Sequence, residues 1–268
     1  MSESSRHDAW QAGESYDLYM GRWSRRVAPH FLDWLSPQAD ARWLDVGCGT
    51  GALSEAIVRR CRPRSVVAVD RSPGFLARAR ENVPDARVSF EVGDAQSLPV
   101  PTASVDIAVS GLMLNFIPDR LAALVSLRRA ARAGGLVAFY VWDYPGGGVE
   151  FMRKFWSAAS GLDPAARSLN EDVRFPFCTQ PALLELARQS GLGAVESVAL
   201  EADTVFADFD DYWRPFTLGA GPAPGYCANL EPAARERLRE ALFNSLPRSE
   251  DGSIPLRVRA WGVRGVSA

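Results

Sequence analysis

The chain has 268 residues, of which 47% are hydrophobic and 23% are charged, and its formal net charge is −2. This composition is typical of a globular protein with a sizeable core, and it predicts no surface for nucleic acid or for an anionic membrane. No apolar run reaches the roughly 18 residues of a membrane helix, and the four cysteines lack metal-ligand spacing, so we expect a cytoplasmic protein with reduced cysteines and no bound metal.

The predicted elements begin after a polar stretch, 1–13, which lacks the apolar core of a signal peptide and is expected to be disordered. Residues 14–36 are amphipathic and aromatic, which predicts two N-terminal helices. Strand-like and helical runs then alternate through 41–145. We expect strands at 41–46, 65–70, 87–93, 105–110 and 136–142, and helices at 51–61, 72–82 and 119–132.

The second half of the chain is less regular. A helix at 181–190, a sixth strand at 195–200 and a seventh at 254–263 continue the pattern. The seventh alternates apolar and polar residues, which we interpret as an edge strand with one face on solvent. We expect one domain over 1–268, with its core at 41–145, 181–200 and 253–264. Two cap insertions, 146–180 and 206–250, would hold helices at 149–160 and 232–246 and loops at 161–176 and 219–225.

Several predicted strands are continuous apolar runs, such as 66–69, as expected for strands buried on both faces of a parallel sheet. Because strands and helices alternate, we expect a doubly wound α/β fold with helices on both faces of the sheet.

The most informative segment is 44–54, LDVGCGTGALS, at the junction of the first strand and the first core helix. Glycines at alternate positions permit positive φ and allow a ligand to approach the backbone. At the carboxyl end of the first strand, such a turn is typical of a nucleotide-type cofactor site. The acid that precedes it, Asp45, would repel a pyrophosphate but suits a ligand with an ammonium and a sulfonium.

Three acids follow three successive predicted strands. They are Asp45, Asp70 and Asp94, spaced by 25 and 24 residues. Because the carboxyl ends of parallel strands meet at one crevice, we expect all three to face the same ligand. Asp70 would accept hydrogen bonds from ribose hydroxyls, and Asp94 with Ala95 would bind an adenine edge. Asp45 would face a positive group, through water.

This pattern resembles the class I S-adenosylmethionine-dependent methyltransferases, most strongly over 41–142. The resemblance implies a Rossmann-like, seven-stranded, mostly parallel sheet with an antiparallel seventh strand, and S-adenosylmethionine as the cofactor. It implies that Gly47, Gly49 and Gly51 line the methionine part, with Asp70 on the ribose and Asp94 and Ala95 on the adenine. Backbone near Leu112 would contact the cofactor's amino group.

Other residues are candidates on weaker grounds. Arg22, on the N-terminal helices, would meet the cofactor carboxylate, the alternative being a surface arginine. Asn115, Trp142 and Tyr144 would face the acceptor. The insertions carry many aromatic side chains, which suit either an aromatic cap over a small, partly apolar acceptor or a helical lid packed on itself. The N-terminal aromatics, including Tyr16, are equally consistent with core packing and with a cofactor lid.

We therefore expect methyl transfer to a small molecule by in-line displacement. Methyltransferases that act on the amino groups of bases often carry Asn-Pro-Pro-aromatic after the fourth strand. Here Asn115 is followed by Phe116 and Ile117 before Pro118. This order and the slightly negative net charge argue against DNA as the substrate.

We interpret Cys48 as a small residue that fills the loop rather than as a nucleophile. If the reaction uses a base, the candidates are Asp143 and the Asn115 region acting through water. Two other functions stay open: an NAD(P)-linked oxidoreductase, and a non-catalytic cofactor-binding protein with the same fold. The sequence identifies neither the acceptor, the methylated atom nor the oligomeric state.

Overall fold

The computed structural model describes residues 17–218 and 221–268, so the stretch 1–13, Tyr16 and the start of the predicted N-terminal helices lie outside the described residues. The chain divides into two compact units. Of the described residues, the sheet unit comprises 23–142, 177–200 and 260–268, and the helical unit comprises 17–22, 143–176, 201–218 and 221–259. The single domain expected over 1–268 stays a prediction.

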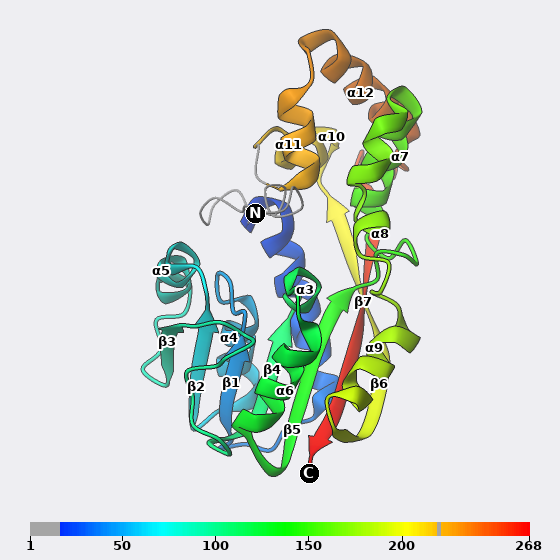
Figure 1. Ribbon diagram of the computed structural model, residues 1–268. Helices are drawn as coiled ribbons and strands as arrows, with labels where there is room; N and C mark the ends of the chain where they lie inside the picture. Colours follow the sequence, from blue (N-terminus) through cyan, green and yellow to red (C-terminus); the bar gives the residue numbers. More distant parts are fainter. Residues whose placement is uncertain (1–16, 219–220) are drawn as a thin grey trace. The chain divides into compact units, whose positions relative to one another are not determined.

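A seven-stranded sheet has the order β3-β2-β1-β4-β5-β7-β6 (Figure 1). The first five strands pair in parallel, and β7 pairs with β5 in antiparallel fashion. The expected seven-stranded, mostly parallel α/β fold with an antiparallel seventh strand is confirmed. The strands are β1 Arg42–Val46, β2 Ser65–Asp70, β3 Val88–Val92, β4 Val105–Gly111, β5 Ala131–Trp142, β6 Leu192–Phe206 and β7 Ile254–Ser267.

The expectation that the seventh strand lies at an edge is wrong. β7 lies between β5 and β6, and β6 occupies the edge. The alternation of buried and exposed residues along 254–258 is real. Alternation reports that one face of a strand meets solvent, whereas the position of a strand in the sheet depends on pairing with distant segments.

Helices lie on both sides of this sheet (Figure 1). Phe31 of α3 packs against Tyr140 of β5 at 4.6 Å between ring centroids, and α6 packs on β4 and β5. The predicted cap of α5 is confirmed, since the Ser72 hydroxyl accepts the N–H of Phe75 at 3.3 Å. The helices are α3 Arg22–Leu35, α4 Ala52–Cys61, α5 Pro73–Asn82, α6 Arg120–Ala130 and α9 Gln180–Gln189.

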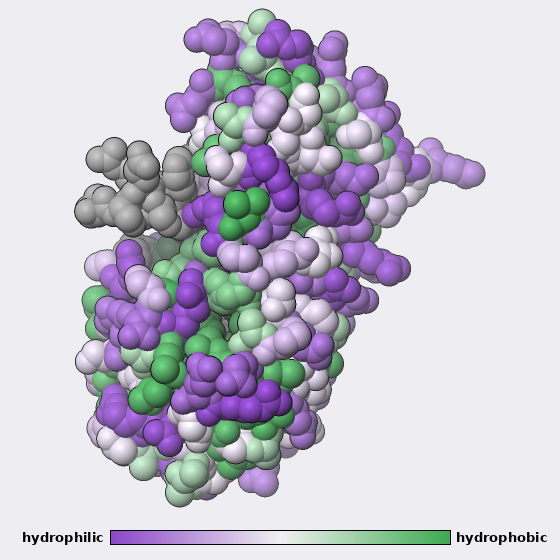
Figure 2. All heavy atoms as spheres, turned by 45° about the vertical axis from the view of Figure 1, so that its right-hand side comes forward, coloured by the Kyte–Doolittle hydropathy of each residue, from purple (hydrophilic) through white to green (hydrophobic). Residues whose placement is uncertain are grey.

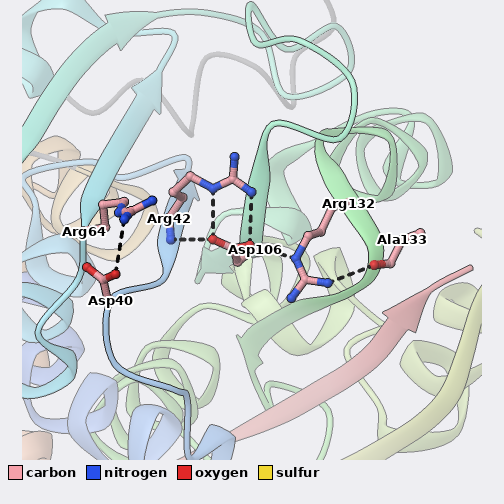
Figure 3. Close-up of polar contacts among 6 residues, drawn as sticks. All are labelled: Asp40, Arg42, Arg64, Asp106, Arg132 and Ala133. Atoms are coloured by element: carbon pink, nitrogen blue, oxygen red, sulfur yellow. Dashed lines mark hydrogen bonds and ion pairs between the residues drawn. The ribbon is translucent and has the colours of Figure 1, made fainter.

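An ion cluster holds together the amino ends of three neighbouring strands (Figure 3). Asp106 of β4 accepts from the Arg42 backbone and side chain of β1 at 2.8–3.1 Å and from Arg132 of β5 at 2.8 Å. The two guanidinium groups hold the pKa of Asp106 well below its usual range, with Arg42 the larger cause. This cluster lies at the opposite end of the strands from the glycine turn.

The helical unit contains more short helices than the sequence indicates. The loops expected at 161–176 and 219–225 instead hold η3 and α8, and α11 from Pro222 onward. Asp163 and Asn170 cap the first two, and prolines occupy the first turns of η3 and α11, where proline starts a helix rather than interrupting it. The elements are η1 Asp17–Gly21, α7 Glu150–Leu162, η3 Pro164–Leu169, α8 Glu171–Arg174, α10 Phe209–Trp213, η4 Arg214–Thr217, α11 Pro222–Asn229 and α12 Pro232–Ser245.

Aromatic side chains fill the interior of the helical unit. Phe155 and Phe216 stack at 4.4 Å, and Tyr19 meets Phe216 at 5.5 Å and Phe151 at 5.8 Å. All four are buried. The sequence left open whether these aromatic residues contact an acceptor or pack on one another. In the structure these four pack on one another, and Tyr19 is part of that core.

Hydrophilic and hydrophobic residues are interspersed over the face shown in Figure 2. The exposed large hydrophobic residues are scattered over both units, as on most protein surfaces. Over the described ranges, no helix is long and apolar enough to cross a membrane.

Candidate functional site

The glycine turn after β1 adopts the left-handed backbone that glycine allows. φ is +72° at Gly47, +54° at Gly49 and +90° at Gly51. The N–H groups of Gly47 and Cys48 both donate to the Val69 carbonyl, at 2.7 and 3.1 Å. These bonds fix the turn to the end of β2, the neighbouring strand.

The three glycines differ in what lies beside them. A Cβ on Gly47 would collide with the side chain of Met113, and a Cβ on Gly51 would lie 2.9 Å from Cγ2 of Val83. A Cβ on Gly49 would meet no heavy atom within 4 Å. Packing therefore requires glycine at the outer two positions, whereas Gly49 faces open space from which a ligand can approach the backbone.

Asp45, at the end of β1, is fully buried, with 0% of its surface exposed. The Ser54 hydroxyl donates to Oδ2 at 2.6 Å, and Oδ1 has no hydrogen-bond partner among the described residues. Burial raises the pKa of Asp45 to about 7, against the hydrogen bond from Ser54, and the nearby Asp70 raises it further. A buried carboxylate with an unsatisfied oxygen is costly unless a positive group compensates it. This arrangement therefore suits a cationic ligand.

Asp70, at the end of β2, reaches back to the same turn. Its Oδ2 accepts the N–H of Gly49 at 3.0 Å, and its Oδ1 accepts the N–H of Ser72 at 2.8 Å. Each carboxylate oxygen has a further lone pair, so both can also accept a hydroxyl. Burial raises the pKa of Asp70, and the two backbone bonds oppose that effect.

Asp94 and Ala95 lie one strand further along the sheet. Asp94 is exposed and accepts the N–H of Gln96 at 2.8 Å, whereas Ala95 is buried. The N–H of Gly93 donates to the Asp70 carbonyl at 3.1 Å, which joins this loop to the end of β2. The structure thus brings two of the three predicted acids directly to the glycine turn and sets the third at the adjacent strand end.

The segment after β4 contains strain and unsatisfied polar groups. Leu112 has φ +59°, a costly conformation for leucine, and its N–H donates to the Tyr140 carbonyl at 2.8 Å. Asn115, in η2 Leu114–Phe116, is only 2% exposed, yet neither its amide nitrogen nor its amide oxygen has a partner in the described part of the chain. The buried Ser110 hydroxyl is also unpartnered there.

The other predicted site residues have different surroundings. Trp142 is buried at the end of β5. Tyr144 and Arg22 belong to the helical unit, where Tyr144 contacts Phe175 at 5.5 Å and Arg22 donates two hydrogen bonds to Asp211 at 2.7 and 2.9 Å. Their roles at a site stay predictions.

The surroundings of Asp143 and Cys48 bear on the roles considered for them as a base and as a nucleophile. Asp143 forms an ion pair with Arg259 at 2.6 Å and accepts the N–H of Gly146 at 3.0 Å, so both carboxylate oxygens are engaged. Cys48 packs in a small apolar cluster with Leu76. Burial, with the nearby carboxylates, raises the pKa of the Cys48 thiol well above its usual value, as expected for a neutral filler.

Sequence reasoning missed Ser54 and Met113. Ser54 is a small polar residue on the buried face of α4, a pattern that could have indicated a partner for Asp45. Met113 packs against Gly47, a contact between segments 66 residues apart that no local pattern reveals.

A family model described as a methyltransferase domain matches residues 44–139. The match includes the glycine turn, the three acids and the segment after β4. Over residues 44–139 the chain is therefore similar to class I S-adenosylmethionine-dependent methyltransferases.

Curated relatives that resemble part of this chain include two bacterial enzymes. Malonyl-(acyl-carrier protein) O-methyltransferase from Serratia marcescens is 36% identical over 129 residues, covering 48% of this chain and 49% of the relative. Trans-aconitate 2-methyltransferase from Methylobacterium nodulans is 35% identical over 118 residues, covering 44% and 45%. The chain thus spans about half the length of these relatives.

Solved structures share the fold over nearly the whole chain. Phosphoethanolamine N-methyltransferase 2 from Haemonchus contortus, in complex with S-adenosylmethionine, has a TM-score of 0.59 at 19% identity, covering 94% of this chain and 56% of that protein. At this identity the likeness establishes the fold only.

Proposed function

We propose that this protein transfers a methyl group from S-adenosylmethionine to a small-molecule acceptor. The observation that carries the proposal is the glycine turn, open at Gly49, beside two buried carboxylates, Asp45 and Asp70. The match of residues 44–139 to a methyltransferase-domain family supports the reaction class.

The residues at the turn fit this cofactor. Asp70 would hold the ribose hydroxyls through its remaining lone pairs. The unsatisfied oxygen of Asp45 would face the ammonium and sulfonium, directly or through water. Asp94 and Ala95 would contact the adenine. Because the N–H of Leu112 is already bonded, its carbonyl is the backbone group left for the cofactor's amino group.

The remaining cofactor contacts follow the same proposal. The Gly47–Gly51 backbone would lie along the methionine part. Arg22 would reach the cofactor carboxylate only by exchanging its ion pair with Asp211 for that contact.

When bound, S-adenosylmethionine supplies a methyl group activated by a sulfonium. Its methyl carbon would be taken by an acceptor lone pair as the carbon–sulfur bond breaks, and the sulfur would keep the electron pair. Charge is neutralised in this step, so the chain contributes chiefly by aligning the acceptor and excluding water. A base is needed only for an acceptor that is protonated at working pH.

We propose Asn115, Trp142 and Tyr144 as acceptor residues, with the unbonded amide of Asn115 the best supported of the three. The acceptor would be a small molecule rather than a nucleic acid, in keeping with the balanced charge of the chain. We further propose a cytoplasmic location, a reducing compartment that suits a chain with four buried cysteines.

Calorimetric titration with S-adenosylmethionine, S-adenosylhomocysteine and NADH tests the cofactor. We expect micromolar binding of the first two and none of NADH. Asp70→Asn should weaken binding at least tenfold, while the matched control Asp106→Asn, at the other end of the sheet, should leave it unchanged. Absence of binding to the folded protein, or NADH binding alone, would refute the proposal.

Turnover distinguishes an enzyme from a cofactor-binding protein. The formation of S-adenosylhomocysteine would be followed with phenols, amines, quinols and carboxylic acids as acceptors. Tight cofactor binding without turnover on any acceptor would favour the non-catalytic alternative.

A further inference from the structure

Arg120, the first residue of α6, has an unpaired guanidinium in a partly buried position. Its Cζ lies over the ring of Phe177, 3.6 Å from the centroid. Its Nε is buried and has no hydrogen-bond partner, and Arg120 forms no ion pair within residues 17–218 and 221–268. Burial lowers the pKa of Arg120, so its charge is held at a cost.

Four other partly buried arginines pair with an acidic side chain, whereas Arg128, at the other end of α6, also has a buried Nε without a hydrogen-bond partner in the described chain. Such pairing is the usual condition for placing a guanidinium away from water. The pairs are Arg22–Asp211, Arg42–Asp106, Arg259–Asp143 and Arg264–Glu196. A guanidinium that stacks on an aromatic ring keeps its planar edge available for a bidentate contact with an anion.

Arg120 belongs to a segment that other contacts link to the glycine turn. It follows Asn115 on the segment that leaves the carboxyl end of β4, and η2 packs against α6. Met113 of the same segment packs on Gly47. The N–H of Asp119 donates to the side chain of Gln96 at 3.2 Å, which joins the start of α6 to the loop after β3.

Several polar groups at the end of β4 and on the segment after it are buried without a hydrogen-bond partner, an arrangement that is energetically unfavourable. The amide nitrogen and the amide oxygen of Asn115 and the hydroxyl of Ser110 have no hydrogen-bond partner in the described structure. A bound molecule that carries both a negative charge and a neutral hydrogen-bonding group would satisfy Arg120 and Asn115 together.

We propose that Arg120 and Asn115 recognise a methyl acceptor that carries a carboxylate. The guanidinium, held by Phe177, binds the carboxylate, and the Asn115 amide binds a second polar group of the same molecule. A carboxylate matches the single charge of Arg120 better than a phosphate dianion does, since Asp119 adjoins it and would repel a second negative charge. This inference rests on the proposed function, because it assigns the acceptor class of that same site.

Acid selectivity tests the proposal. Phenylacetate, succinate and glutarate, each beside its amide, and inorganic phosphate would be titrated into protein saturated with S-adenosylhomocysteine. We expect at least one acid to bind tenfold tighter than its amide. Arg120→Gln should bring that ratio close to one, and Arg120→Lys should restore part of it. Arg128→Gln removes a charge from the other end of the same helix and should change nothing.

Asn115→Leu gives an independent measure, because it should weaken an acid and its amide alike. Where turnover is seen, Arg120→Gln should raise KM for the acid at least tenfold with little change in kcat. Binding of S-adenosylhomocysteine should stay within twofold in every variant.

Three results would overturn the proposal: an unchanged ratio in Arg120→Gln, no preference of the wild type for any acid, or binding of phosphate alone. Failure of the proposed function is seen separately, as absent binding of S-adenosylhomocysteine. In that event titration of the acids without it still decides whether Arg120 recognises a carboxylate.

Discussion

Replacement of Asp45 by Asn tests the electrostatic reasoning at the glycine turn. Asn has the same shape and can still accept from the Ser54 hydroxyl, but it never ionises. The pKa of Asp45 is about 7 in the folded protein, above its ordinary value of 3.8. Between these values the folded state binds the proton more tightly than the unfolded state, so this group lowers stability as pH rises from about 4 to 7.

The magnitude follows from that difference. At roughly 1.4 kcal/mol per pKa unit, ionising the buried Asp45 costs up to ~4 kcal/mol. Urea unfolding of both proteins at pH 4.5, 6 and 8 isolates this cost, because all other groups titrate equally in the two. The stability of Asp45→Asn relative to wild type should rise by a few kcal/mol over this range. An equal difference at pH 4.5 and pH 8 would refute the burial argument.

Ligand affinity should change in the opposite direction. A charge pair about 6 Å apart, through one water, contributes roughly 2–3 kcal/mol at an effective dielectric of about 20. Asp45→Asn should therefore bind S-adenosylmethionine about 100-fold more weakly at pH 8. In wild type, binding must release a proton below pH 7, so affinity should rise with pH up to about 7 and then level off. A variant with wild-type affinity and the same pH profile would show that Asp45 does not face the cation.

Three further changes have defined outcomes. Gly49→Ala should lower the unfolding free energy by about 1–2 kcal/mol, because residue 49 has a left-handed backbone, and should weaken S-adenosylhomocysteine binding at least tenfold in calorimetry. Gly51→Ala should lower the melting temperature more than Gly49→Ala does. Normal binding by Gly49→Ala would show that no ligand approaches the backbone at this position. Asp106→Asn should lower the unfolding free energy by about 1–2 kcal/mol at pH 7. The deficit should begin to shrink below about pH 4 and vanish only as pH falls through the lowered pKa of Asp106, because the carboxylate stabilises the fold only while it is ionised. A deficit that is the same at pH 7 and pH 2.5 would contradict the ion-cluster argument. Phe155→Ala should cost about 3–5 kcal/mol, and a smaller loss in chemical unfolding would indicate that the aromatic core of the helical unit is loosely packed.

Most of the sheet unit could be predicted from the sequence because its elements are marked by local chemistry. Ser72 and Pro73 begin a helix, and the apolar run before Asp70 is a strand buried on both faces. The acids at strand ends were predictable for the same reason, since parallel strands bring their carboxyl ends to one edge.

The rest depends on contacts between distant segments. The interior position of β7 comes from its pairing with β5, and the alternation within 254–263 carries no information on that neighbour. Arg120 resembles any surface arginine in the sequence. Only the structure shows that it stacks on Phe177, 57 residues away, and that it has no acidic partner in the described chain. The aromatic residues of the insertions were correctly located, but their mutual packing could not be distinguished from a ligand-binding cap.

The interior place of β7 also constrains how the sheet can assemble. β6 precedes β7 in the chain, yet its neighbour in the sheet is β7. β6 therefore joins the sheet only through 254–267, either after β7 has paired with β5 or together with β7 as a preformed pair. We expect the β5-β7-β6 side to form last during folding, and an intermediate that lacks it would be prone to edge-to-edge association.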